Sequence, residues 1–141
     1  MHFSTLFILK NETLENISKS EIDDLFSDRF CYCCGESRPK YRYWCDWFQV
    51  GGRWGELFVA KKGLIGDRSW CNEKDPVEKD HYAICEIKDL TEPIDKDCIY
   101  AVATKSRIYE AESHREKFDK LIDQINRKEI NGVIALIDCH D

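Results

Sequence analysis

The run of apolar residues at 133–137, Val-Ile-Ala-Leu-Ile, constrains the fold more than any other segment of the chain. It contains no polar residue, so both of its faces need cover from other parts of the protein. This is typical of a central or well-covered strand, whereas a half-exposed strand alternates apolar and polar residues. We therefore predict that the chain folds around a sheet with residues 133–137 near its centre.

The segment before this strand predicts an amphipathic helix. Ser113 and Glu116 have the spacing of a capping box, in which two side chains satisfy free backbone amides at the start of a helix. Asn131-Gly132 supplies the stop. The apolar residues that share its predicted buried face are Phe118, Leu121, Ile122 and Ile125.

The first half of the chain repeats this order of strand and helix. Residues 3–9 are rich in aromatic and branched side chains and predict a strand. Ser18 and Glu21 again have capping-box spacing and predict a helix that ends near Arg29. The aromatic residues 41–50 predict a second strand, which Gly51-Gly52 breaks.

With a further strand at residues 99–104, the order is βαββαβ, which is the order of the ferredoxin-like fold. We predict one α+β domain over residues 1–141, with a single antiparallel sheet, two helices on one face, and residues 55–97 inserted between the middle strands. The alternative is an irregular α+β sheet of five or six strands.

Charge and the N-terminal sequence narrow the class of protein. The net charge is −6, with 27 acidic and 21 basic residues interspersed, so general nucleic-acid binding is not expected. The apolar segment 3–9 is too short to cross a membrane and has none of the flanking features of a secretion signal. We expect a cytoplasmic protein without a membrane partner, whose eight cysteines are reduced.

An unusual aromatic block at residues 44–54 holds the first group of candidate site residues. They are Trp44, Asp46, Trp47, Arg53 and Trp54. Aromatic rings beside a guanidinium form a flat surface suited to stacking a base or a peptide group. The alternative is an aromatic core strand whose glycine bend is locked by a structural Asp46–Arg53 ion pair.

The end of the chain holds the second group, Asp138 and His140. In a ferredoxin-like sheet the second and fourth strands end at the same edge, about 14 Å apart, so these residues face the glycine bend across one rim. His2 also approaches His140 in that strand order. An acid/base function is one interpretation, and hydrogen bonds that anchor the chain end are the other.

The cysteines at 31 and 34 form a C-x-x-C-G knuckle, a shape that zinc sites use. A tetrahedral site needs two more ligands, and the chain offers no second knuckle. Cys31 and Cys34 are the candidate metal ligands, with reduced structural thiols as the alternative. We expect no other cofactor.

Three landmarks together resemble a set of uncharacterised small proteins from bacteria and their phages. They are Asp46-Trp47, Gly51-Gly52-Arg53-Trp54 and Asp138-Cys139-His140. The resemblance implies a bacterial or phage context, in which small acidic domains act by binding, in some cases as inhibitors of host defence systems. The expected partner is a protein or a nucleotide-like ligand. The alternatives are a metal-independent hydrolase or transferase that uses Asp46, Arg53, Asp138 and His140, and a zinc-stabilised interaction module.

Overall fold

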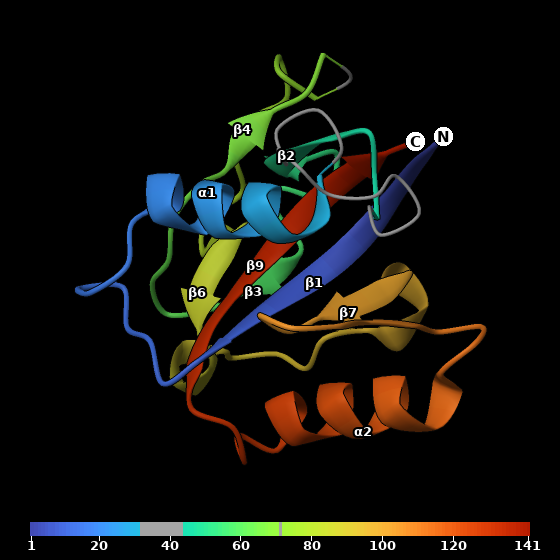
Figure 1. Cartoon of the computed structure of the whole chain (residues 1–141). Helices are drawn as coiled ribbons and strands as arrows, with labels where there is room; N and C mark the ends of the chain where they lie inside the picture. Colours follow the sequence, from blue (N-terminus) through green and yellow to red (C-terminus); the bar gives the residue numbers. More distant parts are fainter. Residues whose placement is uncertain (32–43, 71) are drawn as a thin grey trace.

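The two longest strands run side by side through the centre of the protein (Figure 1). The computed structural model describes residues 1–31, 44–70 and 72–141. Strands β1 (His2–Lys10) and β9 (Gly132–His140) pair in antiparallel orientation over their whole length, from His2 opposite His140 to Lys10 opposite Gly132. The predicted strands 3–9 and 133–137 are confirmed. The two chain ends lie together at one end of these central strands.

Shorter strands extend the sheet on both sides, in the order β4-β2-β9-β1-β7-β8, with β6 also paired to β9. Strands β3 and β5 form a separate two-stranded sheet. In chain order the short elements are β2 (Trp47–Gly52), β3 (Phe58–Val59), β4 (Asp67–Arg68), β5 (His81–Tyr82), β6 (Ile84–Glu86), the 3-10 turns η2 (Ile87–Asp89) and η3 (Lys96–Cys98), β7 (Ala101–Ala103) and β8 (Ile108–Glu110).

The two helices cover opposite faces of this sheet. Helix α1 (Lys19–Phe30) packs on the face that carries Phe3 and Phe7. Helix α2 (Arg115–Asn126) packs on the face that carries Leu6 and Ile8. Our prediction of two helices on one face was wrong, because β1 and β9 are apolar on both faces along most of their length and each face needs its own cover.

The prediction of a single antiparallel sheet was also wrong, and the ferredoxin-like topology is not confirmed. β7 is parallel to β1 and β4 is parallel to β2, so the sheet is mixed. The predicted second strand, residues 41–50, is observed as β2, which begins only at Trp47 and includes the Gly51-Gly52 pair that we expected to break it. Residues 41–43 lie outside the described residues. β2 lies beside β9 and antiparallel to it instead of beside β7. Packing explains this position, since Phe48 of β2 contacts Phe26 of α1, with their ring centroids 4.9 Å apart.

The two predicted capping boxes have different outcomes. Ser18 caps α1, and both hydrogen bonds of the box with Glu21 are present. In α2 the residue at the N-cap is His114, without a side-chain capping bond, so the predicted box between Ser113 and Glu116 was wrong. The Ser113 hydroxyl lies 3.0 Å from Nδ1 of His114 instead.

No helix in the described part of the chain is long and apolar enough to cross a membrane. Together, the helices and strands form an α+β arrangement with a mixed central sheet and one helix on each face.

Candidate functional site

Polar and aromatic side chains gather where β1 and β2 begin and β9 ends. Side chains at alternate positions of a strand share one face, so His2 and Asp138 lie on the α2 side of the sheet. Trp47 pairs directly with His140 on the same side. The core packed against α2 is built from Leu6, Leu136 and other apolar residues further along these strands. We call His2, Trp47, Asp138 and His140 the open end of the sheet.

Asp138 is the buried centre of the open end. Its side chain is 0% exposed, and both carboxylate oxygens have partners. Oδ1 lies 2.8 Å from Nδ1 of His2, and Oδ2 accepts a hydrogen bond of 2.9 Å from the backbone N–H of Arg53. A carboxylate only accepts, so the neutral His2 ring carries its proton on Nδ1 and leaves Nε2 as an acceptor.

The Gly51-Gly52 bend brings the Arg53 amide to this carboxylate. Gly51 and Gly52 have φ values of 97° and 55°, which side chains other than glycine rarely adopt. A Cβ on Gly52 would lie 2.4 Å from Oδ2 of Asp138, so no larger residue fits. The turn is closed by a hydrogen bond of 3.1 Å from the Trp54 N–H to the Gly51 carbonyl.

Three aromatic rings form the outer surface of the open end. The indole of Trp47 stacks on the imidazole of His140, with centroids 4.7 Å apart and planes inclined by 21°. The His2 ring meets both of them edge-on, at 5.6 Å and 4.8 Å. Trp47 is 40% exposed, so the stack offers a flat apolar surface to a partner.

A cavity of about 490 Å³ adjoins His2. Its lining includes His2, Ser4, Trp54, Lys96, Glu112 and Arg115. Nζ of Lys96 lies 2.9 Å from Oδ1 of Asp123, and this hydrogen bond raises the pKa of Lys96 above its usual range. Arg115 lies 3.5 Å from Asp119. The two basic groups of the cavity are therefore already engaged by carboxylates of α2.

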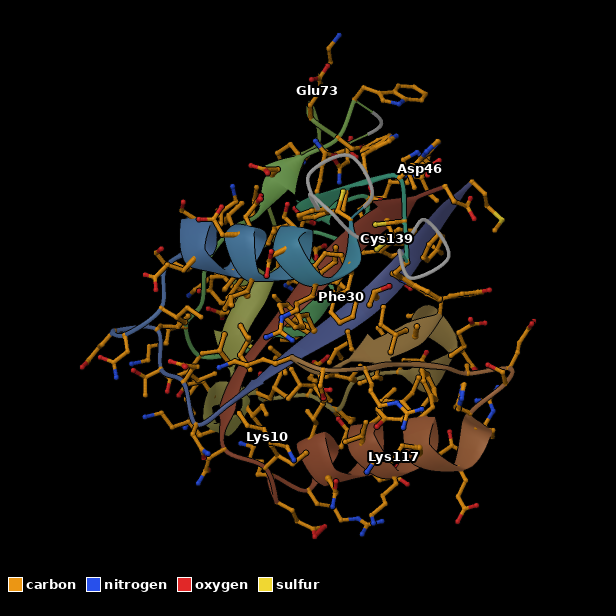
Figure 2. The ribbon with its side chains drawn as sticks, in the orientation of Figure 1. Lys10, Phe30, Asp46, Glu73, Lys117 and Cys139 are labelled. Carbon is orange, nitrogen blue, oxygen red and sulfur yellow. The ribbon has the colours of Figure 1, made fainter. Side chains whose placement is uncertain are left out.

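The predicted residues of the aromatic block separate in the structure. Trp44 lies on the α1 side, where its Nε1 donates to Thr5 at 2.9 Å and its ring meets Phe3 edge-on. Asp46 is exposed near the chain ends (Figure 2) and makes no ion pair with Arg53. The alternative of an Asp46–Arg53 lock was wrong, because Arg53 closes the bend with its amide, and its side chain is exposed.

The two segments that we expected to meet do lie together, for a different reason. We predicted that β2 and β9 run in the same direction and end at one rim, about three strand spacings apart, on the order of 14 Å. They are instead antiparallel neighbours, so the start of β2 at Trp47 meets the end of β9 at His140. The glycine bend at the end of β2 then folds back over Asp138.

Buried thiols cluster on the α1 side of the same strands. Cys31 and Cys45 form a β-bridge, and Cys139 lies beside them in the core under α1 (Figure 2). The hydrogen bond with Cys139, together with burial, raises the pKa of the Cys45 thiol well above its usual range. No group of three or more His, Cys, Asp or Glu residues among the described ones is arranged to hold a metal ion. Cys34 lies outside the described residues.

Sequence reasoning placed His2 near His140 but missed its bond to Asp138 and the adjoining cavity. A signal was present, since the polar residues His2 and Ser4 alternate at the start of an otherwise apolar strand, as Asp138 and His140 do at the end of another. Such polar alternation at a strand end predicts a face that the core leaves uncovered. Comparison with protein-family models, curated proteins and solved structures gives no match for this chain.

Proposed function

We propose that the chain is a small binding protein that engages a protein or a nucleotide-like ligand through the open end of the sheet. The observation that carries this proposal is the exposed Trp47 ring, stacked on His140 beside the fixed imidazole of His2. Tryptophan is enriched at binding hot spots because a rigid ring covers a large area at little entropic cost. Arg53, whose exposed side chain makes no ion pair with the described residues, extends this surface.

The proposed setting is the cytoplasm of a bacterium or of a phage-infected host cell, where the protein inhibits a defence system of the host. The resemblance of its sequence landmarks to uncharacterised small proteins from bacteria and their phages supports this setting. Expression in bacteria that carry a restriction or CRISPR system tests it. Phage plating should rise relative to cells that express the Trp47→Ala variant, and equal plating argues against an inhibitor.

Binding itself is tested by capture of a partner from a bacterial lysate on immobilised protein. Trp47→Ala should reduce recovery of the partner by at least about tenfold, and Arg53→Ala should weaken it without loss of folding. Trp70→Ala is the matched control, because Trp70 is 78% exposed on a different loop. Equal recovery with Trp47→Ala and Trp70→Ala would contradict the proposal.

A second candidate function is a metal-independent hydrolase or transferase. The observation in its favour is the buried Asp138 bonded to His2, since a carboxylate that orients an imidazole is a common arrangement for proton transfer. Of the residues that we expected to act, Asp138 and His140 lie at the open end, whereas Asp46 and the Arg53 side chain point to solvent. Turnover that disappears in His140→Ala with a changed pH profile favours this function.

The zinc-stabilised module stays a hypothesis, with Cys31 and Cys34 as its candidate ligands. Metal analysis of the purified protein tests this hypothesis, and a zinc content below about a tenth of an equivalent would exclude it.

A further inference from the structure

The cavity beside His2 is lined by one hydrogen-bond acceptor and one donor that have no partner. Nδ1 of His2 is taken by Asp138, and Nε2 makes no hydrogen bond within the described part of the chain. Nε1 of Trp54, which can only donate, likewise has none there. Both residues line the same cavity, so an acceptor and a donor without partners among the described residues belong to its wall.

The tautomer of His2 is what makes the acceptor fixed. A free histidine exchanges its proton between the two ring nitrogens and offers no constant pattern. Here the buried carboxylate of Asp138 holds the proton on Nδ1, and the Arg53 amide holds the carboxylate. The glycine bend therefore helps to fix the orientation of the His2 ring, through two hydrogen bonds in series.

The charges around the cavity argue against a phosphate as the main recognition element. Lys96 and Arg115 are engaged by Asp123 and Asp119. The lining also contains the carboxylates of Asp97 and Glu112, so its charges balance. A volume of about 490 Å³ lies in the range of sites for small molecules.

We propose that this cavity binds a nucleoside through the edge of its base and does not require a phosphate. An edge that carries an N–H group and a carbonyl or ring nitrogen complements Nε2 of His2 and Nε1 of Trp54. The ribose hydroxyls can donate to the carboxylates of the lining. This inference rests on the proposed function, since it names the class of the nucleotide-like ligand and moves that ligand from the Trp47 surface to the cavity.

Calorimetric titration of the intact protein with adenosine, cytidine, guanosine and uridine tests the inference. At least one nucleoside should bind, and its monophosphate should bind with an affinity within about threefold of the nucleoside, as expected where Lys96 and Arg115 are paired with carboxylates of α2. Trp54→Phe keeps an aromatic ring in the cavity while it removes the donor and part of the ring area, so it should weaken binding about 3- to 10-fold. Trp70→Phe is the control and should leave the affinity unchanged.

One result would overturn the inference, namely that no nucleoside binds. If only the monophosphates then bind, the cavity recognises a phosphate. If N-acetylalanine methylamide binds instead, with the same sensitivity to Trp54→Phe, the cavity recognises a peptide group, which offers the same donor and acceptor. Thermal denaturation of Trp54→Phe shows whether the variant is folded.

The outcome is separable from that of the proposed function. If no nucleoside binds but Trp47→Ala still abolishes capture of a partner, the cavity inference fails and the binding protein stands. If nucleoside binding depends on Trp54 but capture of a partner does not depend on Trp47, the cavity inference is supported and binding through the Trp47 surface is contradicted.

Discussion

Strands β1 and β9 end differently on their two faces. On the α1 side, the buried residues Phe3 and Cys139 continue the core to the very ends of the strands. On the α2 side, the same ends carry His2, Asp138 and His140. Successive residue pairs of the same two strands alternate between the two faces. Phe3 pairs with Cys139 on the α1 side, and His2 pairs with His140 on the α2 side. The backbone is shared, so the difference lies only in the side chains and in what covers them.

It follows that the core does not require polar side chains at the open end. A buried carboxylate is costly unless each of its oxygens has a partner, and an apolar side chain at position 138 would avoid that cost. The chain instead devotes a glycine bend and a histidine to keeping Asp138 satisfied. We infer that the α1 side serves stability and that the open end serves binding.

Removal of a large side chain from the α1 side should have the largest effect on stability. Phe26→Ala should lower the free energy of unfolding by about 4 kcal/mol, because Phe26 is fully buried and contacts Phe7, Phe30 and Phe48. Urea denaturation measures this, with Phe26→Leu as a milder control at about 1 kcal/mol. A loss below about 1 kcal/mol for Phe26→Ala would contradict the account of this face.

A substitution in the glycine bend should have the second-largest effect on stability. Gly52→Ala should lower the free energy of unfolding, measured by urea denaturation, by about 3 kcal/mol. The φ of 55° is unfavourable for alanine, and the new Cβ would lie 2.4 Å from the Asp138 carboxylate. Gly55→Ala is the matched control, because the nearest atom to a Cβ there is 3.3 Å away.

A double variant separates the clash from the backbone strain. In Gly52→Ala with Asp138→Ala, the combined loss should be smaller than the sum of the two single losses, because the clashing carboxylate is gone. Strict additivity would mean that the bend does not depend on Asp138.

Loss of the carboxylate charge should have a moderate effect on stability. In Asp138→Asn one of the two oxygens becomes an NH₂ group, so either His2 or the Arg53 amide faces a donor instead of an acceptor. The expected cost is about 1–2 kcal/mol in urea denaturation. Asp46→Asn, on an exposed side chain, is the control and should change the stability by less than about 0.5 kcal/mol.

Truncation of the exposed tryptophan should have the smallest effect on stability and a large effect on binding. Trp47→Ala should cost about 1 kcal/mol or less, since the ring is 40% exposed and packs mainly on His140. If Trp47→Ala lowers the free energy of unfolding by about 3 kcal/mol or more, as truncation of a core aromatic side chain does, then Trp47 is part of the core. That result would remove the distinction between the two faces.

The amino-acid sequence predicted the parts of the fold that depend on local pattern. The apolar runs of β1 and β9 and the Ser18 box of α1 are visible as residue spacing. The side of the sheet that each helix covers and the neighbour of β2 depend on contacts between distant segments, such as Phe26 with Phe48, which no local pattern encodes.

For the site, the sequence marked the right segments and the wrong interactions. The Gly-Gly-Arg motif was visible, but an arginine that acts through its backbone N–H cannot be told from one that acts through its guanidinium. His2 could be placed near His140 from the sequence, but its bond to Asp138 could not, because a single histidine at the start of a strand is most often a surface residue. Its role arises from the register that places β1 against β9.

The bond between His2 and Asp138 is the contact on which the open end and the cavity both depend. Nitrogen-15 NMR of the imidazole rings, at an alkaline pH where histidine is neutral, reads it directly. The account predicts that His2 carries its proton on Nδ1, with Nε2 unprotonated, and that this preference is lost in Asp138→Asn. A His2 ring protonated on Nε2 in the unmodified protein would contradict it.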